Sequence, residues 1–574
     1  MVNKFGQFVL GLLGTNVASK FSITVGSLGS WTYPDDTAAA SFIDKDGTYY
    51  FQQSDGEYAP TATRVWSFFT GFNIDDAKLS PLTHSVNPNN PLDSNGNTTW
   101  RCNNSPTGRE STYAPNGPAS AMHYSQRNFC DLMGVWIDPD TGDWHGLVHN
   151  EFTPQPFGDN LHYDAIDYTV SQDQGKTWNI SHHIITSPYP TVRGDNKTFP
   201  HETYYYGDGD PRLIVDVAGG YFYATYGSRV ISKGEGGWWT TYYTHAARAP
   251  LSGKLARGWQ KWYAGSWSEP GIGGKESNIV PVSDDNQNGY TAPEDEYSPL
   301  TPGTAPEQIA AGKMPPTSAL FWMDVSYNAY LGLWIGEPNN LITTTTTPQE
   351  FYATDDLSTQ KWTLIGDTGD AYLTKSAYRF LLDDVSKSSS TIIGKNFRAY
   401  CSYGCSTGNS EFVHLAIDGA AAVPVDTSKR YVIRAGGQAL DNDHGVATST
   451  HQGTQWTFAA TGDGAYTIIS VAGALGVSSQ STKSRAWGSS LSIGVATGDI
   501  GQQWWVLPDR SGDGSTGTGE FRIVNRFSGL YLALSGDKDR LAEATPGRSW
   551  TDKSGSKVGG GRRPDEQTLT LVAV

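Results

Sequence analysis

Short apolar and aromatic strands separated by glycine-containing turns recur along the first 400 residues. Each unit leads from a small or acidic segment into an apolar strand, a turn and an aromatic strand. Such units occupy residues 35–51, 133–152, 208–228 and 318–336, and a less complete one occupies 393–404. A single hairpin cannot bury a core, so the units must pack against one another. Radial packing protects the sheet edges, which predicts a β-propeller. Five blades fit the units best, although about 400 residues could also hold six or seven.

The composition supports an all-β chain of more than one domain. Aromatic residues make up 12% of the chain, there are 65 glycines, and charged residues reach only 17%. Long amphipathic helices need more Glu, Lys and Leu than this. At 574 residues the chain also exceeds the usual size of one core. We therefore expect short strands and tight turns in at least two domains.

The charge indicates the class of partner. The net charge is −17 and the isoelectric point about 5.1, so the chain lacks the basic surface that nucleic acids require. Aromatic rings can instead stack on the C–H faces of neutral sugars. The expected partner is a polysaccharide or oligosaccharide, bound by a monomer. No apolar stretch is long enough to span a membrane.

The N-terminus and the cysteines predict secretion. Residues 1–19 have the outline of a signal peptide, with one Lys before a short apolar run; a buried first strand is the alternative. The four cysteines fall into two close pairs, which predicts the bridges Cys102–Cys130 and Cys401–Cys405 and an extracellular location. A zinc site is excluded because no CxxC pair is present. Four glycosylation sequons begin at Asn97, Asn103, Asn179 and Asn196.

One turn motif supports the propeller. The segment 171–178, SQDQGKTW, matches the Asp-box pattern S-x-D-x-G-x-T-W of sialidase-like propellers, and 354–362 is a looser version. In this turn Asp173 would bond local backbone, Gly175 would take a left-handed conformation, and Trp178 would pack between sheets. The motif is therefore evidence about the fold and does not indicate a catalytic site.

The last 145 or so residues resemble the ricin B-type lectin domain. The resemblance rests on Gln-x-Trp-like signatures that end in GTQW at Trp456, QQWW at 502–505 and a degenerate EQTL at 566–569. It implies a β-trefoil over residues 429–574, and the hairpin units before it predict the propeller over 20–425. Sugar sites in this family begin with an Asp, and only the unit containing Asp441 and Asn442 retains it. We expect this part to bind a glycan as an independent module; a purely structural trefoil is the alternative.

Carboxylates at the starts of candidate inner strands could converge at the propeller axis. Tyr33-Pro-Asp35-Asp36 and Gly207-Asp208-Gly209-Asp210 each precede a strand, and Glu269 lies in a Ser-Glu-Pro-Gly segment. These fragments resemble the five-bladed glycosidases of the arabinanase and xylosidase type. The resemblance implies Asp36 as general base, Glu269 as general acid and Asp210 as modulator of the acid. Hydrolysis with inversion needs such a pair of carboxylates, and a third acidic group raises the pKa of the acid.

The cluster His149-Asn150-Glu151 is an alternative source of catalytic groups. Glu151 could replace Glu269 as the acid, and His149 could bind a sugar hydroxyl or act as a base. Three other residues beside these strands are predicted substrate contacts: Asp35, Asp208 and Arg212. For each carboxylate the competing interpretation is that it caps a turn beside Gly or Pro.

The sequence thus predicts a secreted glycoside hydrolase acting on a polysaccharide, with arabinofuranose as one candidate sugar. No cofactor or catalytic metal is expected, and a structural calcium ion is compatible with the chain. Three alternatives stay open. A sialidase needs an arginine triad, and the chain lacks an F-R-I-P segment near its start. A polysaccharide lyase could use a His/Tyr pair, and a non-enzymatic lectin would only bind. The histidines considered for a lyase are His123, His149, His162 and His201.

Overall fold

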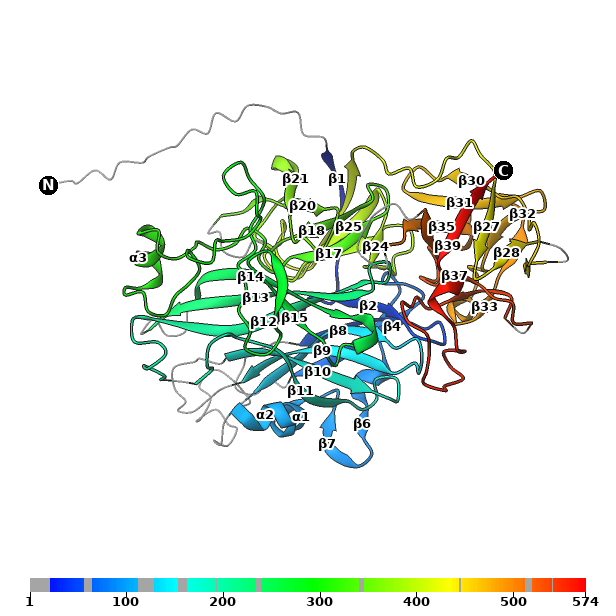
Figure 1. The fold of residues 1–574 in the computed structure, drawn as a ribbon. Coiled ribbons are helices and arrows are strands. Elements are labelled where there is room, and N and C mark those ends of the chain that lie inside the picture. Colours follow the sequence, from blue (N-terminus) through cyan, green and yellow to red (C-terminus); the bar gives the residue numbers. More distant parts are fainter. Residues whose placement is uncertain are drawn as a thin grey trace.

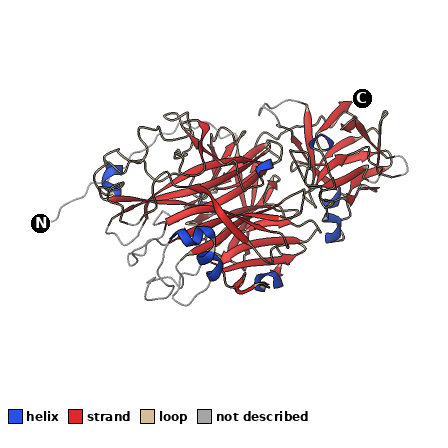
Figure 2. Ribbon diagram, turned by 60° about the horizontal axis from the view of Figure 1, so that its bottom comes forward, coloured by secondary structure: helices blue, strands red, loops and turns tan. Residues whose placement is uncertain are grey.

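The computed structural model describes residues 21–55, 64–111, 128–152, 163–192, 194–233, 239–339, 345–442, 445–510, 519–538 and 540–574. The predicted signal peptide, His123 and His162 lie outside these ranges. The described chain is nearly all-β, with short helices α1 (Thr99–Asn104), α2 (Pro106–Ser111) and α3 (Ala305–Ala310) (Figures 1 and 2). Among these residues, no helix has the length and apolar character needed to cross a membrane.

The N-terminal part is a five-bladed β-propeller, as the repeated units predict. Each blade begins with its innermost strand. Blade 1 comprises β2 (Ala40–Ile43), β3 (Tyr49–Asp55), β4 (Val65–Gly71) and β5 (Lys78–Leu79). Blade 2 comprises β8 (Phe129–Ile137), β9 (Trp144–Phe152), β10 (Tyr163–Ser171) and β11 (Asn179–Thr186). Blade 3 comprises β12 (Thr203–Asp216), β13 (Tyr221–Ser232), β14 (Trp239–Pro250), β15 (Gln260–Tyr263) and β16 (Ser266–Pro270).

The last two blades complete the ring. Blade 4 comprises β17 (Asp324–Asn328), β18 (Leu333–Glu337), β20 (Glu350–Thr354) and β21 (Thr363–Asp367), and β24 (Ile392–Ile393) pairs with β17. Blade 5 comprises β23 (Phe380–Asp383), β25 (Asn396–Cys401), β26 (Glu411–Asp418) and β1 (Ser22–Ser30). Because β1 pairs antiparallel with β26, a strand from the start of the chain closes the last blade. Two small hairpins lie outside the blades: β6 (Val86–Asn87) with β7 (Asn90–Ser94), and β19 (Thr347–Pro348) with β22 (Leu373–Thr374).

The Asp box between β10 and β11 has a structural role. Asp173 accepts hydrogen bonds from the backbone N–H and the hydroxyl of Thr177, at 2.9 and 2.8 Å. Gly175 has a φ of +80°, and a Cβ there would lie 2.6 Å from the Trp144 ring. Trp178 is 5% exposed and packs edge-on against Trp66 of blade 1. The turn therefore joins two blades.

Both predicted disulfides are present. Cys102–Cys130 ties α1 to the inner strand of blade 2, and Cys401–Cys405 closes a short loop after β25. Of the four sequon asparagines, Asn103 is buried and donates to the carbonyl of Thr99, whereas the other three are exposed.

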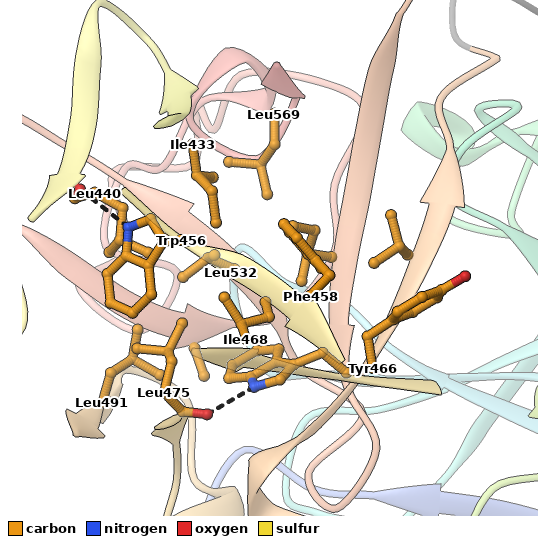
Figure 3. Close-up of a cluster of buried hydrophobic side chains, with 14 of the residues drawn as sticks. Ile433, Leu440, Trp456, Phe458, Tyr466, Ile468, Leu475, Leu491, Leu532 and Leu569 are labelled. Carbon is orange, nitrogen blue, oxygen red and sulfur yellow. Dashed lines mark hydrogen bonds between the residues drawn. The ribbon is translucent and has the colours of Figure 1, made fainter. Parts of the chain in front are cut away.

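The C-terminal part is a β-trefoil. Its strands are β27 (Tyr431–Ala435), β28 (Gln438–Asp441), β29 (Ala447–Ser449), β30 (Thr457–Ala460), β31 (Ala465–Ser470), β32 (Gly473–Gly476), β33 (Ser489–Ser490), β34 (Ser492–Gly494), β35 (Gln503–Pro508), β36 (Glu520–Asn525), β37 (Tyr531–Leu534), β38 (Ala542–Thr545) and β39 (Leu569–Ala573). Trp456 and Trp504 are fully buried in its core. Leu569, the last residue of the third, degenerate signature, is buried in the same core as Trp456 (Figure 3). The two indoles donate equivalent hydrogen bonds, to the carbonyls of Leu440 and Leu475.

The trefoil contacts the end of the propeller at which the inner strands finish. It reaches every blade there through backbone or ion-pair contacts. The propeller residues that accept these contacts are Lys45, Asp140, Asp216, Asp355 and Asp383. The inner strands start at the opposite end of the propeller, which is therefore separate from the trefoil. The predicted site residues Asp36 and Asp210 lie at that end.

Candidate active site

Each of the first four inner strands has an aspartate at or just before its start or, in the long strand β12, midway along it. Asp36 precedes β2, Asp131 lies in β8, Asp210 lies in the long strand β12, and Asp324 opens β17. The inner strands run in the same direction around the axis, so these side chains gather at one end of the propeller. We call this set the acidic ring. Blade 5 contributes Tyr378 and Arg379, which precede β23.

Arg64 joins the first two blades of the ring. Its guanidinium lies 3.1 Å from Asp131, 3.5 Å from Glu151 and 3.7 Å from Asp36. The arginine is 1% exposed and its charged carbon lies 4.4 Å from the centre of the Phe129 ring. A buried cation in contact with three carboxyl groups compensates part of their charge and holds them together.

His149 connects blades 2 and 3. It lies on β9, with Nδ1 at 3.5 Å from Asp210 and 3.8 Å from Glu151, and with Nε2 at 3.5 Å from Asp164. Burial opposes a charge on the ring, but these carboxylates outweigh it and raise the pKa of His149 to about 10. The imidazole is therefore protonated at neutral pH.

Arg229 on β13 forms ion pairs with Asp164, at 2.8 Å, and with Asp210. Its guanidinium also lies over the Trp322 ring, 5.3 Å from its centre. All four of these side chains are buried. The carboxylate of Asp210 thus has two cationic neighbours, His149 and Arg229, from two different blades.

The backbone of β12 is irregular where it carries Asp210. The pairing of β12 with β13 shifts between Tyr205 and Asp208 and again between Gly209 and Arg212. Asp210 has a φ of +51°. A Cβ on Gly209 would lie 2.4 Å from Nε2 of His149 and 2.8 Å from Asp164, so only glycine allows His149 to approach the strand this closely.

Unusual backbone conformations gather around the ring. Among the described residues, ten that are not glycine have a positive φ, and three of them border this site: Asp210, Trp322 and Tyr378. The Trp322 and Tyr378 rings stack with their centres 5.3 Å apart. Such conformations cost of the order of 1–3 kcal/mol each and cluster at functional sites.

Two neighbouring carboxyl groups of the ring, those of Asp36 and Asp131, titrate at different pH values. Burial and the neighbouring Glu151 and Asp210 raise the pKa of Asp36 to about 6, although Arg64 opposes the shift. Burial, together with Glu151 and Asp36, raises the pKa of Asp131 to about 8 against the effect of Arg64 and His149. At neutral pH the ring therefore contains an ionised Asp36 beside a carboxyl group that still holds a proton.

Asp131, His149 and Glu151 place potential metal ligands within 4.8 Å of one another. Arg64 contacts both carboxyl groups, and the high pKa of His149 keeps its imidazole protonated. A protonated imidazole cannot ligate a metal, since the ligand is the neutral ring. A metal ion at these residues would have to displace this proton and compete with Arg64 for both carboxyl groups.

Glu269, predicted as the acid, lies away from the ring. It is on β16, the edge strand of blade 3, and its carboxylate accepts a hydrogen bond from the backbone N–H of Lys275 at 3.1 Å. The structure instead brings Glu151 into the cluster, 3.5 Å from Arg64. An edge strand cannot present its side chains at the axis, which is the physical reason for the difference.

Asp208 belongs to a second buried network within blade 3. Lys261 donates to Asp208 at 3.0 Å and to Glu276 at 2.6 Å, and the hydroxyls of Tyr205 and Tyr226 also donate to Glu276. Burial and the neighbouring Glu276 raise the pKa of Asp208 well above its usual range. This network anchors the bulged segment that carries Asp210.

The other predicted contacts have varied positions. Asp35 is 9% exposed, and its carboxylate accepts a hydrogen bond from the backbone N–H of Asp36, as a turn cap would. Arg212 is buried with its charged carbon 6.0 Å from the centre of the Tyr378 ring, on the side of Asp324. His201 lies in the loop before β12.

In the trefoil, Asp441 and Asn442 are adjacent and half-buried at the end of β28. Asp441 accepts hydrogen bonds from the hydroxyl of Thr454 at 2.7 Å and from the N–H of Asn442. The Asn442 amide donates to Ser470 at 3.0 Å. Both side chains are thus oriented by neighbours at the trefoil surface.

Sequence reasoning missed Asp131, Asp324, Arg64 and Glu276. The sequence did contain a signal for the two aspartates. Asp131 precedes the apolar strand of the second unit and Asp324 lies inside the fourth unit, just as Asp36 lies inside the first and Asp210 inside the third. An aspartate sought at the same place in each unit would have found both. Arg64 and Glu276 are outside any repeated pattern.

No family model matches the chain, and no curated protein sequence matches it. Among solved structures, an exo-β-1,3-galactanase from Clostridium thermocellum is 13% identical with a TM-score of 0.32, over 96% of this chain and 100% of that one. The catalytic domain of an α-L-arabinofuranosidase from Coprinopsis cinerea is 10% identical with a TM-score of 0.32, over 70% and 98%. A designed three-fold symmetric protein is 23% identical with a TM-score of 0.19, over 25% and 99%. At such identities and TM-scores the likeness does not extend to activity.

Proposed function

We propose that the protein is a secreted glycoside hydrolase that cleaves a neutral glycan at the acidic ring of its propeller. The observation that carries the proposal is the pairing of Asp36, with a pKa of about 6, and the Asp131–Glu151 pair, in which Asp131 has a pKa of about 8. Glycoside hydrolysis needs one ionised and one protonated carboxyl group. Both forms coexist in the ring at neutral pH.

Asp36 has the position expected of the general base. Its side chain is 23% exposed, whereas those of Asp131 and Glu151 are 5% exposed or less. A water molecule can therefore reach Asp36 from solvent, and the carboxylate would take its proton as the water attacks the sugar. Asp210, held by His149 and Arg229, would orient the sugar and adjust the charge of the ring.

Glu151 would act as general acid, sharing one proton with Asp131. Two carboxyl groups this close cannot both ionise at low cost, so the pair retains a proton to a higher pH than either would alone. Arg64 contacts both and fixes their orientation. The proton would pass to the leaving oxygen as the glycosidic bond breaks.

Two alternative reactions are less well supported by the described residues of this site. A lyase needs a deprotonated base, whereas His149 has a pKa of about 10 and burial raises the pKa of Tyr378 well above its usual value. A sialidase needs a group of arginines that are available to a substrate carboxylate. Arg64 and Arg229 are already paired with carboxylates of the protein, which leaves Arg212 with two nitrogens unpartnered among the described residues.

The test is a polysaccharide screen of the whole protein, with arabinans, xylans and galactans as substrates. New reducing ends without an ultraviolet-absorbing unsaturated product would support hydrolysis. An unsaturated product would indicate a lyase, and binding without any product would indicate a lectin.

The two candidate acids can be separated with matched substitutions. Glu151→Gln should lower kcat on the identified substrate by at least two orders of magnitude, because the general acid supplies about 10²–10⁴-fold. Glu269→Gln, on the edge strand, should leave kcat within a factor of about two. The reverse result would move the acid to Glu269 and contradict the role of the ring.

A further inference from the structure

A cavity lies between the propeller and the trefoil. Its volume is about 300 Å³, and we call it the interdomain chamber. The inner strands β2, β8, β12 and β17 end at one wall, and the trefoil strands β35 and β36 form the other. It therefore lies at the opposite end of the propeller axis from the acidic ring.

The walls of the chamber are rich in aromatic rings from both domains. The propeller contributes four and the trefoil three. These rings are Phe42, Trp136, Tyr327 and Trp334 from the propeller, and Trp487, Trp505 and Tyr531 from the trefoil. Four of the seven, Trp136, Tyr327, Trp487 and Tyr531, are only half-buried although they lie at a domain interface. Ring surface is thus left uncovered by protein inside the chamber.

Polar groups in the chamber include one unused donor. Trp334 is 4% exposed, and its indole N–H is buried without an acceptor among the described residues. Burying such a donor unpaired costs about 1–3 kcal/mol. The N–H has almost no surface open to the chamber, so a ligand hydroxyl would relieve this cost only together with a shift of the ring. Arg510 lies beside it, 5.7 Å from the centre of the Trp334 ring, and contacts both oxygens of Asp216 at 3.1 Å.

The two arginines that line the chamber are neutralised within the protein: Arg510 pairs with Asp216, and Arg526 pairs with Asp383 and Asp463. An anionic ligand would therefore lack a free cation. The exposed Asp355 also lines the chamber and has no ion pair among the described residues. The chamber is suited to a neutral molecule that has both apolar faces and hydroxyl groups.

A narrower cavity continues from the chamber along the axis. Its volume is about 80 Å³; it shares Trp334 and Thr391 with the chamber and is lined by Arg212 and Asp324 of the acidic-ring end. At about 30 Å³ per water molecule this space holds two or three waters, not a sugar ring. The chamber is therefore a separate site and not a passage for the substrate of the ring.

We propose that the interdomain chamber is a binding site for a neutral mono- or disaccharide, distinct from both the acidic ring and the Asp441 region. Its volume is at the lower end of the range of small-molecule sites, about 300–1,000 Å³. The C–H faces of the sugar would stack on the half-buried rings, and a hydroxyl would accept from Trp334. The proposal does not depend on the activity of the acidic ring.

The experiment uses the full chain with Asp36→Asn, which stops turnover at the acidic ring, and Asp441→Asn, which removes the candidate sugar contact of the trefoil. This protein is titrated by calorimetry with galactose, arabinose, xylose and lactose. We expect at least one of them to bind in a component that is lost when the chamber alone is altered. Thr391→Trp, which fills the chamber, should abolish binding, and Trp334→Phe should weaken it about five-fold, the equivalent of one hydrogen bond.

Trp100→Phe, a change in α1 of the propeller, is the matched control and should leave the affinity unchanged. Circular dichroism and thermal unfolding check that each variant is folded. If Thr391→Trp does not fold, Trp334→Phe decides the question. The proposal is overturned if none of the four sugars binds up to its solubility limit. It is also overturned if binding survives unchanged in the folded chamber variants.

Discussion

Asp36 and Asp131 have the same side chain and share one arginine, yet burial separates their protonation. Asp36 is 23% exposed on its side chain and Asp131 only 3%. Desolvation penalises the charged form more strongly in the more buried group, and Glu151 adds repulsion to both. Aspartate thus provides both an ionised and a protonated group, whose pKa values differ by about two units.

These values predict a bell-shaped dependence of kcat/KM on pH. Activity should rise as Asp36 loses its proton near pH 6, because the base must be ionised. It should fall as the Asp131–Glu151 pair loses its proton near pH 8, because the acid must be protonated. Initial rates between pH 4 and 10 measure both limbs. A rising limb near the ordinary aspartate pKa of about 4 would be inconsistent with Asp36 as the base.

Asp36→Asn tests the base directly. The amide keeps the shape of the side chain but cannot accept the proton of water, so kcat should fall by several orders of magnitude with little change in KM. The exposed residue Asp284, changed to Asn, serves as the control. A variant at position 36 that keeps most of its kcat but loses affinity would make Asp36 a substrate-binding residue, with Glu151 the next candidate for the base.

At the scale of elements, β12 determines the geometry of the ring. The strand has two shifts in its pairing with β13, and Asp210 lies between them in a left-handed conformation. Lys261 holds Asp208 on one side of the bulge, and His149 packs against Gly209 on the other. Bulges re-aim side chains next to active sites, and here the bulge directs Asp210 toward blade 2.

Gly209→Ala should therefore reduce the activity of the acidic ring more than the stability of the fold. The new methyl group would lie 2.4 Å from Nε2 of His149 and would displace the imidazole from Asp210 and Asp164. We expect at least a ten-fold loss of kcat and a destabilisation of about 1–3 kcal/mol. Gly253→Ala is the control, since its nearest neighbour would be 3.7 Å away. Unchanged kinetics in a folded Gly209→Ala protein would show that His149 does not need this contact.

At the scale of the whole molecule, the trefoil forms a cap over one end of the propeller. Arg526, 3% exposed, contacts both oxygens of the fully buried Asp383 of blade 5, at 2.6 and 3.1 Å. Arg548 is fully buried and contacts Asp140 of blade 2 at 2.9 Å. A trefoil expressed alone would lose these partners, so we expect it to be less stable alone than within the full chain.

Removing one interdomain cation should destabilise the whole chain. Arg526→Met leaves Asp383 buried without its main counter-charge, which we expect to lower the free energy of unfolding by about 3–5 kcal/mol. Arg563→Met, at a 53% exposed side chain, should change it by less than about 0.5 kcal/mol. Urea unfolding at neutral pH measures both. Equal stabilities would mean that the two domains are not coupled through this pair.

Much of the fold could be predicted because its signals are local. The hairpin units, the Asp box at 171–178 and the Gln–Trp signatures each depend on residues close together in the chain, and all correspond to observed turns and strands. The cysteine pairs were predictable by proximity. The residues of the site were harder to predict. Asp36, Asp210, His149 and Glu151 do lie together, whereas Glu269 lies on an edge strand and Asp131 was not predicted.

The sequence by itself determined an all-β chain with a repeated unit and a different C-terminal texture, because strand patterning and turn chemistry act over a few residues. Only the tertiary structure decided which carboxyl groups meet, which pKa values they acquire, and where the trefoil docks. Those properties depend on burial and on distances between residues far apart in the chain, such as Arg64 with Glu151 and Arg526 with Asp383. No local pattern encodes such distances, since each results from the closure of all five blades around one axis.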